Sequence, residues 1–187
     1  MNKTIIQSTP FGPVALVWSL FDKRPTIVRV VLSRPGFPAD IEVSRLFPGI
    51  AASSCLEINA VSSGIEAFLN GEDVKFTLDL VHMDSCTAFQ QAVLRAEHGI
   101  PRGSVSTYGL IAAHIGNAKA ARAVGTALAT NPFAIIVPCH RTIRSDRHLG
   151  GFGGGIKMKR ALLEAEGVPF DNLGRAAGIR LHYSPEG

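Results

Sequence analysis

The residues whose side chains are most suited to catalysis lie together at positions 138–141, Pro138-Cys139-His140-Arg141. The apolar run 134–137 precedes them and predicts a buried strand or extended segment that Pro138 ends. A thiol beside an imidazole and a guanidinium can have a lowered pKa, and its thiolate is a nucleophile. The alternative is a small buried packing residue. Because adjacent side chains of an extended chain point to opposite sides, a direct Cys139–His140 hydrogen bond requires a local bend or a bridging water.

Five glycines around one aromatic residue follow this segment, in Leu149-Gly150-Gly151-Phe152-Gly153-Gly154-Gly155. Such a run forms neither a good helix nor a good strand, and it lets the backbone approach a ligand closely. It lacks the Lys-Ser/Thr ending of a phosphate-binding loop and the strand-to-helix setting of a dinucleotide fingerprint. The run predicts a pocket-forming loop, with a flexible linker as the alternative.

An acidic residue, Glu166, ends the last expected helix. The apolar face of that helix carries Met158, Ala161, Leu162 and Ala165, whereas Lys157, Lys159 and Arg160 fall elsewhere, and Gly167 stops it. A carboxylate at the C-terminal end of a helix dipole is unfavourable. Glu166 is therefore expected to have a specific partner, and a histidine is the natural candidate.

Helical spacing begins at Thr87, which can cap a helix with Phe89, Val93 and Ala96 on one face, ended by Gly99 and Pro101. Two short helices should follow. Thr107 caps the first, which stops at Gly116, and the second carries Ala121, Val124, Gly125 and Leu128 on one face. Two short helices joined by a tight turn containing glycine suggest a helix-turn-helix.

The opposite face of the second short helix carries Lys119, Arg122 and Thr126. Arg122 should therefore point outward, where a nucleic-acid groove could receive it. An αα-hairpin with a solvated charged face fits this segment equally well.

The first half of the chain has the pattern of a small sheet with a helix. Strands are expected at 14–18, 26–32 and 74–80, a long loop with at most a short helix at 33–54, and a helix over 61–69 that ends at Asn70-Gly71. The predicted fold class is α+β. Residues 1–85 form a small α/β scaffold domain with an antiparallel sheet, residues 86–170 a mainly helical domain with the helix-turn-helix, and residues 171–187 a C-terminal tail.

Composition indicates a globular chain. Of 187 residues, 46% are hydrophobic and 18% charged, which excludes whole-chain disorder. No apolar run is long enough to span a bilayer and no signal-peptide core is present, so a cytoplasmic protein is expected. Three cysteines without CxxC spacing argue against a disulfide framework and a zinc ribbon, and leave at least one thiol free.

The net charge of +4 is divided unevenly. Residues 1–85 carry seven Lys and Arg against nine Asp and Glu, whereas residues 86–187 carry twelve against six. The basic half is where a polyanionic partner would bind. An ordinary solubilising excess is the alternative.

The motifs of residues 86–168 together resemble the O6-alkylguanine-DNA alkyltransferases. Five ordered segments carry the resemblance: Ile100-Pro101-Arg102-Gly103, Thr107-Tyr108-Gly109, residues 116–125 (GNAKAARAVG), Asn131-Pro132 with Pro138-Cys139-His140-Arg141, and the glycine run. The first half is similar only weakly, chiefly through Thr9-Pro10-Phe11-Gly12-Pro13.

The resemblance implies direct, single-turnover DNA repair by a monomer without a cofactor. Duplex DNA carrying O6-alkylguanine would bind through its minor groove, and the damaged base, or an O4-alkylthymine, would be flipped into a pocket. Cys139 would be the nucleophile that keeps the alkyl group as a thioether. His140 would accept the thiol proton, Glu166 would orient that imidazole, and Tyr108 would donate to the leaving base.

The resemblance also implies roles for the surrounding residues. Arg122 would fill the space that the flipped base leaves, and the remaining DNA contacts would come from Lys119, Thr107, Ala121 and Gly125. Asn131 matches a hinge residue beside the site, and the pocket and its support would comprise Asn131, Pro138, Arg141, Leu149, Gly150, Phe152 and Gly153.

Two departures from the family pattern bear on function. Many relatives have Ser where this chain has Gly153, so one polar contact to the alkylated oxygen is expected to be missing and larger adducts to be tolerated. Some relatives hold zinc in the first domain, but residues 1–85 offer only Cys55 and His82, so no metal is expected.

Three alternatives remain at this point. A non-catalytic relative that binds alkylated DNA would carry Trp where this chain has Cys139. A helix-turn-helix transcription regulator would show sequence-specific affinity without alkyl uptake. A cysteine hydrolase using Cys139 and His140 would turn over repeatedly and would not need Arg122.

Overall fold

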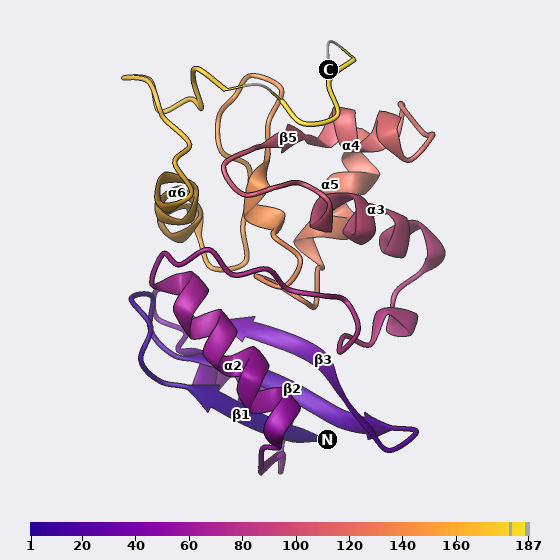
Figure 1. Cartoon of the computed structure of the whole chain (residues 1–187), viewed down its shortest axis with the longest axis vertical. Helices are drawn as coiled ribbons and strands as arrows, with labels where there is room; N and C mark the ends of the chain where they lie inside the picture. The colour runs from indigo at the N-terminus through magenta and orange to yellow at the C-terminus, as the bar shows by residue number, and fades with distance from the viewer. Residues whose placement is uncertain (180, 186–187) are drawn as a thin grey trace. The chain divides into compact units, whose positions relative to one another are not determined.

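The computed structural model describes residues 1–179 and 181–185. The chain divides into two compact units (Figure 1). The first comprises residues 1–85 together with 132–136, and the second comprises residues 86–131 together with the chain from 137 onward.

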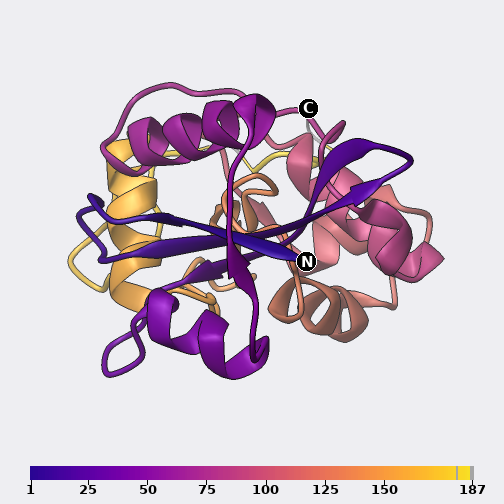
Figure 2. The same ribbon diagram turned by 90° about the horizontal axis from the view of Figure 1, so that it is seen from below.

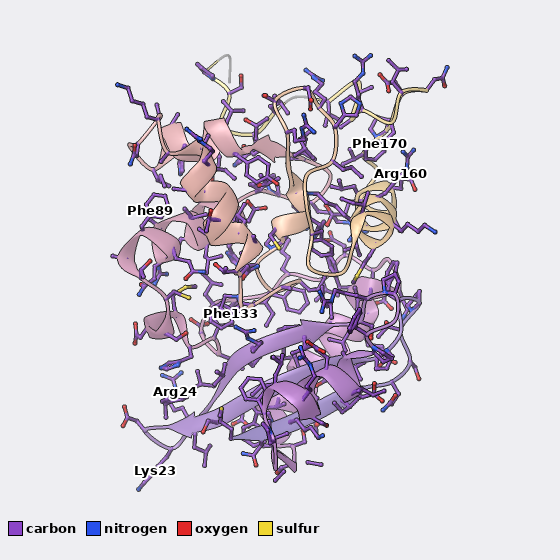
Figure 3. The ribbon with its side chains drawn as sticks, turned by 180° about the vertical axis from the view of Figure 1, so that it is seen from behind. Lys23, Arg24, Phe89, Phe133, Arg160 and Phe170 are labelled. Atoms are coloured by element: carbon purple, nitrogen blue, oxygen red, sulfur yellow. The ribbon has the colours of Figure 1, made fainter. Side chains whose placement is uncertain are left out.

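A four-stranded sheet forms the centre of the first unit. Its strands are β1 (Asn2–Ile6), β2 (Val14–Phe21), β3 (Arg24–Leu32) and β4 (Ala51–Ala52), in the order β3-β2-β1-β4. β1, β2 and β3 pair antiparallel as expected, whereas the short β4 pairs parallel with β1. The β2–β3 hairpin turns at Asp22 and Lys23, whose φ angles of 49° and 65° are those that a tight two-residue turn requires. Figure 3 labels Lys23 and Arg24 at this turn.

Two helices cover opposite faces of this sheet, as Figure 2 shows. They are α1 (Ala39–Leu46) and α2 (Leu56–Leu69). Ala39 and Val43 of α1 pack in one cluster with Ala15, Val17 and Val31. Alternation along β2 leaves the neighbouring apolar side chains for the face that α2 covers.

Residues 74–80 do not form the expected strand. Their side chains alternate between half-buried and exposed, as the sequence pattern requires, but the backbone joins no ladder. The alternation instead reflects packing on α2, where Phe76 contacts Phe68 edge to face with ring centroids 5.9 Å apart. The short helix allowed within residues 33–54 is α1, whereas β1 and β4 were not anticipated, and α2 begins five residues before the expected start.

The second unit is mainly helical. It contains α3 (Ala88–His98), α4 (Tyr108–His114), α5 (Ala121–Ala129) and α6 (Ile156–Ala165), with a two-stranded parallel pair, β5 (Ser106–Thr107) and β6 (Thr142–Ile143). The hydroxyl of Thr87 accepts a hydrogen bond from the Gln90 amide, and that of Thr107 from the Leu110 amide, so both predicted helix caps are confirmed. α4 and α5 pack together across the turn at Gly116, where φ is 79°. The predicted α+β fold class with a helix-turn-helix is confirmed.

The apolar run 134–137 is not a strand. It forms successive turns, with the buried Ile135 at a φ of 75°, a strained conformation for a β-branched residue. Residues 132–136 belong to the first unit, where the Val30 amide donates to the Pro132 carbonyl at 2.7 Å. A continuous apolar run indicates burial, but it does not distinguish a buried strand from buried turns.

The chain after α6 folds back on the second unit. The His182 amide donates to the Val105 carbonyl at 2.7 Å, and the Tyr183 hydroxyl donates to the Ala96 carbonyl at 2.8 Å. The Arg160 guanidinium lies over the Phe170 ring, 4.5 Å from its centroid (Figure 3). The described part of residues 171–187, predicted from the sequence as a C-terminal tail, thus packs against the second unit.

Candidate active site

Cys139 begins a single 3₁₀ turn, η2 (Cys139–Arg141), that follows Pro138. The turn is closed by hydrogen bonds from the Cys139 amide to the Val137 carbonyl and from the Arg141 amide to the Pro138 carbonyl, both 2.8 Å. This is the local bend that the sequence required if neighbouring side chains are to act together. The side chains of the turn then need not alternate as they would in an extended chain.

The Cys139 thiol is buried, with 9% of the residue exposed. Burial raises the pKa of the thiol to about 11, although a hydrogen bond from the Asn131 side chain opposes this shift. The lowered pKa considered from the sequence is therefore wrong, because the cost of burying a thiolate exceeds the stabilisation from its neighbours. At neutral pH Cys139 is a protonated thiol, which needs a base before it can act as a nucleophile.

A base lies in the same turn. His140 Nε2 is 2.9 Å from Glu166 Oε1, and both side chains are buried. Burial lowers the pKa of His140, and the partly compensating hydrogen bond that the imidazole donates to Glu166 does not reverse the shift, so the imidazole is neutral at pH 7. Because the carboxylate can only accept, Nε2 carries the proton and Nδ1 is the basic nitrogen. His140 is thus the partner that the position of Glu166 predicted.

Arg141 completes this cluster from the other side. Its guanidinium donates to Glu166 Oε2 at 2.9 Å and Oε1 at 2.8 Å, and to the Ile100 carbonyl at 2.6 Å. Burial opposes ionisation of Glu166, but the hydrogen bonds from His140 and Arg141 outweigh it and lower its pKa to about 2. Glu166 is therefore a carboxylate at all physiological pH values, able to stabilise an imidazolium that forms beside it.

The thiol borders a cavity of about 270 Å³. The lining residues come from α4, α5, η2 and the glycine run: Tyr108, Gly125, Leu128, Ala129, Cys139, Gly151, Phe152 and Gly153. Since liquid water occupies about 30 Å³ per molecule, the space has the volume of roughly nine waters, enough for one flat aromatic base. The cavity therefore places a thiol and a phenol against the same small occupant.

Tyr108 and Gly150 meet closely at the edge of this cavity. A Cβ atom added at Gly150 would collide with the Tyr108 hydroxyl, whereas one added at Gly153 would have no heavy atom within 4 Å. Burial raises the pKa of Tyr108, so its hydroxyl remains protonated and can donate a hydrogen bond. Only Gly150 of these two glycines is required by close packing.

A second, wider cavity of about 690 Å³ opens beside the first and shares Tyr108, Gly125 and Ala129 with it. Arg122 of α5 lines this second cavity, together with Ala121 and Thr126. The side chain is exposed, as its position on the outer helix face predicted. A cation thus lies next to the space that adjoins the thiol.

The other predicted residues are distributed around these cavities. Asn131 donates to the Val137 carbonyl at 3.2 Å, which supports the chain just before the nucleophile. Lys119 is exposed in the turn before α5 but lines neither cavity. Thr107 is 5% exposed and its hydroxyl caps α4, so its contribution is to position Tyr108. Leu149 packs with the cluster around Val105 and Ile143.

Five further residues lie near the site without having been singled out from sequence. Glu97, Thr142 and Lys159 are fully buried, and Arg144 and Ser145 line the second cavity. A signal for Glu97 existed, because it lies four residues after Val93 on the buried face of α3. Lys159 was placed off the apolar face of α6, yet its side chain has no exposed surface.

The described residues show neither a metal-binding cluster nor a membrane-spanning helix. No group of three or more His, Cys, Asp and Glu side chains within residues 1–179 and 181–185 is placed to hold a metal ion. Within the same residues, the helices are too short or too polar to cross a bilayer. None of the three cysteines, all of which lie within the described residues, forms a disulfide.

Comparison with known proteins agrees with the fold. The family model for the DNA-binding domain of 6-O-methylguanine DNA methyltransferase matches residues 88–168. A methylated-DNA–protein-cysteine methyltransferase of Methanothermobacter thermautotrophicus is 42% identical over 120 residues, 64% of this chain and 67% of that protein. That of Haemophilus influenzae is 46% identical over 114 residues, 61% of this chain and 63% of that protein. These matches span about two thirds of the relatives' length.

A solved structure is similar over more of the chain. The OGT of Mycobacterium tuberculosis, solved in complex with DNA, superposes with a TM-score of 0.70 at 36% identity, over 89% of this chain and 93% of that one. The fold and site thus define an α+β protein with a helix-turn-helix and a buried cysteine. The chain belongs to the methylated-DNA–protein-cysteine methyltransferase family.

Proposed function

We propose that this protein repairs DNA by transferring the alkyl group of O6-alkylguanine to Cys139, once per molecule. The observation that carries the proposal is the small cavity where Cys139 and Tyr108 face one occupant, with His140 and Glu166 in the same cluster. Membership of the family supports the reaction class. The site of action is the cytoplasm, where the substrate DNA is accessible.

The reaction begins with removal of the thiol proton. Neutral His140 accepts it at Nδ1, directly or through a bridging water, and Glu166 stabilises the resulting imidazolium. The Cys139 sulfur then attacks the alkyl carbon, the S–C bond forms, and the bond from that carbon to O6 of guanine breaks. Because the product is a stable thioether, the protein does not turn over.

The leaving guanine needs a proton as it departs, because its anion is a poor leaving group. Tyr108 is the donor that the cavity offers, and its raised pKa keeps its hydroxyl protonated until the base departs. The proton held by His140 returns to Tyr108 through solvent, which balances the reaction. The products are unmodified guanine and S-alkylated Cys139.

DNA binding is assigned to the helix-turn-helix. Arg122 borders the cavity next to the thiol pocket, so it can enter the stack while the damaged base occupies the pocket. Lys119, exposed before α5, is positioned for a phosphate contact. Duplex DNA with O6-alkylguanine, bound through its minor groove by one copy of the chain, is the proposed partner.

The intact mass of the protein after mixing with DNA that contains O6-methylguanine tests this function. We expect a gain of one methyl group by the wild-type protein and no gain by Cys139→Ala. An unchanged wild-type mass with tight, sequence-specific DNA binding would instead indicate a transcription regulator. Repeated release of product would indicate a hydrolase.

A further inference from the structure

Three buried polar side chains next to the site have no part in the transfer described above. They are Glu97 on α3, Thr142 on β6 and Lys159 on α6, and each is 0% exposed. Ionisable groups are almost never fully buried unless they are paired, because losing their water is costly. The way in which these three residues are connected therefore indicates what they do.

Thr142 connects the other two. Its hydroxyl is hydrogen-bonded to Glu97 Oε2, and its carbonyl oxygen accepts from Lys159 Nζ at 2.5 Å. Lys159 Nζ also donates to the Gly151 carbonyl at 3.3 Å. Thr142 directly follows the nucleophile turn and Gly151 lines the thiol cavity, so one ammonium holds two chain segments that border Cys139.

The charges on Glu97 and Lys159 depend on each other. Burial lowers the pKa of Lys159 to about 8, and the negative charges of Cys139 and Glu97 oppose that shift. Burial likewise raises the pKa of Glu97 to about 7 against the hydrogen bond from Thr142 and the charges of Lys159 and Arg141. The other titratable groups that sense Glu97 are Tyr108, Cys139 and Tyr183.

One oxygen of Glu97 remains without a hydrogen bond. Oε1 is buried and has no donor within hydrogen-bond distance among the described residues. The hydrogen bond from Thr142 to Oε2 stabilises the carboxylate most, and the positive charges of Lys159 and Arg141 add to it. This arrangement suits a counter-ion better than a group that serves only to accept hydrogen bonds.

We propose that Glu97 is a positioning residue of the transfer site: it is the counter-ion that keeps the buried Lys159 ammonium protonated, so that this ammonium holds the Thr142 and Gly151 carbonyls beside Cys139. A neutral amine binds two carbonyls less strongly than an ammonium does. The charge on Lys159 also favours the Cys139 thiolate. Loss of that charge should therefore slow alkyl transfer. This inference rests on the proposed function, because the rate concerned is that of alkyl transfer.

The protonation of Lys159 can be measured without alkyl transfer. The chain has only six lysines, so their ¹³Cε resonances can be followed by NMR from pH 5 to 11, and the Lys159 signal is the one missing from Lys159→Arg. In Glu97→Gln we expect the Lys159 midpoint to fall by about one pH unit, because the uncharged amide no longer favours the ammonium. Glu164→Gln is the matched control, since Glu164 is a half-exposed carboxyl on α6 paired with Arg160. It should leave the Lys159 midpoint unchanged.

The rate of methyl transfer is then compared at two pH values. At pH 6 Lys159 is protonated with or without the Glu97 charge, so Glu97→Gln should react as fast as wild type. At pH 8 about a half of Lys159 should be protonated in the wild type and about a tenth in Glu97→Gln. The variant should therefore transfer the methyl group about fivefold more slowly than the wild type at this pH. A merely structural role for Glu97 would change the rate equally at both pH values.

The outcomes separate this inference from the proposed function. A wild-type protein that gains no methyl group overturns the proposed function, whatever the NMR titration shows. Normal methyl uptake with the same Lys159 midpoint in wild type and Glu97→Gln overturns the role of Glu97. If Glu97→Gln does not fold, the NMR titration of Lys159 in the wild-type protein tests the role of Glu97. Shared titration steps for Glu97 and Lys159 support the counter-ion role, and independent single steps contradict it.

Discussion

At the scale of single residues, the proposed chemistry depends on a neutral histidine that is hydrogen-bonded to a buried carboxylate and lies in the same turn as a buried thiol. Burial raises the pKa of Cys139 to about 11, so its thiol is protonated at neutral pH. His140 is kept neutral by burial, and Glu166 is kept ionised by His140 and Arg141. In the proposed mechanism Cys139 therefore becomes nucleophilic only when His140 accepts the thiol proton. Until then the thiol, which can react only once, stays protonated.

Glu166→Gln should slow methyl transfer by about 10²- to 10³-fold, because the amide no longer stabilises the imidazolium of the general base. The pH profile should change too. In the wild type the rate should fall as pH drops through the lowered pKa of His140, below its ordinary value of 6.5. Single-turnover rates by quenched mass measurement between pH 5 and 8 check both effects. Wild-type rates in Glu166→Gln would remove Glu166 from the mechanism.

Gly150→Ala should reduce the transfer rate by about tenfold or more, because the new methyl group displaces the Tyr108 hydroxyl from the cavity. Gly153→Ala is the matched control, since a Cβ there meets open space. It should react within about twofold of wild type. Equal rates for both variants would show that the position of Tyr108 is unimportant.

Gly153→Ser tests the departure from the family pattern. The side chain fits without collision, so it should fold normally and add one donor near the alkylated oxygen. We expect the wild type to accept benzyl adducts more readily, relative to methyl adducts, than the serine variant does. Identical benzyl-to-methyl rate ratios in the two proteins would contradict this.

At the scale of elements, short helices with well-defined starts position the reacting groups. Thr107 caps α4 and so fixes Tyr108, the first residue of that helix. Thr87 caps α3 in the same way, and the cap is not part of the thiol cavity. The two caps therefore have the same geometry, but only the cap of Thr107 positions a residue of the thiol cavity.

Replacing either cap threonine by alanine should lower the free energy of unfolding by about 1 kcal/mol. Only Thr107→Ala should also slow methyl transfer, by several fold, because Tyr108 loses its fixed position. Urea unfolding and single-turnover rates on the two variants measure both effects. A rate loss in Thr87→Ala of the same size would assign the effect to stability.

Arg122→Ala should weaken binding to duplex DNA and slow its repair more than it slows reaction with free O6-benzylguanine, because the free base needs no flipping. Arg95→Ala, which removes an exposed arginine of α3 outside both cavities, is the control. Rates on both substrates should be compared under identical salt, since phosphate contacts depend on it. Similar losses on duplex and free base would remove Arg122 from the flipping role.

At the scale of the whole molecule, the catalytic cluster also affects acid stability. The pKa of Glu166 is lowered from 4.5 to about 2 in the folded protein. A lowered folded-state pKa contributes stability that is present above pH 4.5 and lost as pH falls toward 2, here up to about 3 kcal/mol. His140 acts in the same direction, because its folded-state pKa is also lowered.

Glu166→Gln should therefore be less stable than wild type at pH 7, and the difference should shrink as pH falls from 4.5 to 3. Urea unfolding at pH 7, 4.5 and 3 measures it. Glu164→Gln, an exposed carboxyl of the same helix, should show no such trend. A constant difference between wild type and Glu166→Gln across this range would contradict the link between the cluster and acid stability.

The sequence by itself determined the candidate reactive residues and the elements that local sequence patterns indicate. The Cys139-His140 pair, the glycine run, both threonine caps and the outward Arg122 follow from residue type, spacing and helical period, which act over a few residues. The need of Glu166 for a partner followed from its place at a helix end. Those inferences needed no knowledge of distant contacts.

Only the tertiary structure decided which distant residues meet and what burial does to them. The alternation at 74–80 records packing on α2, and the apolar run 134–137 records burial of turns, because periodicity reports environment and not hydrogen-bond partners. Glu97, Thr142 and Lys159 come from three elements, and no local pattern shows that they meet. The raised pKa of Cys139 has the same origin, since desolvation depends on everything packed around the thiol.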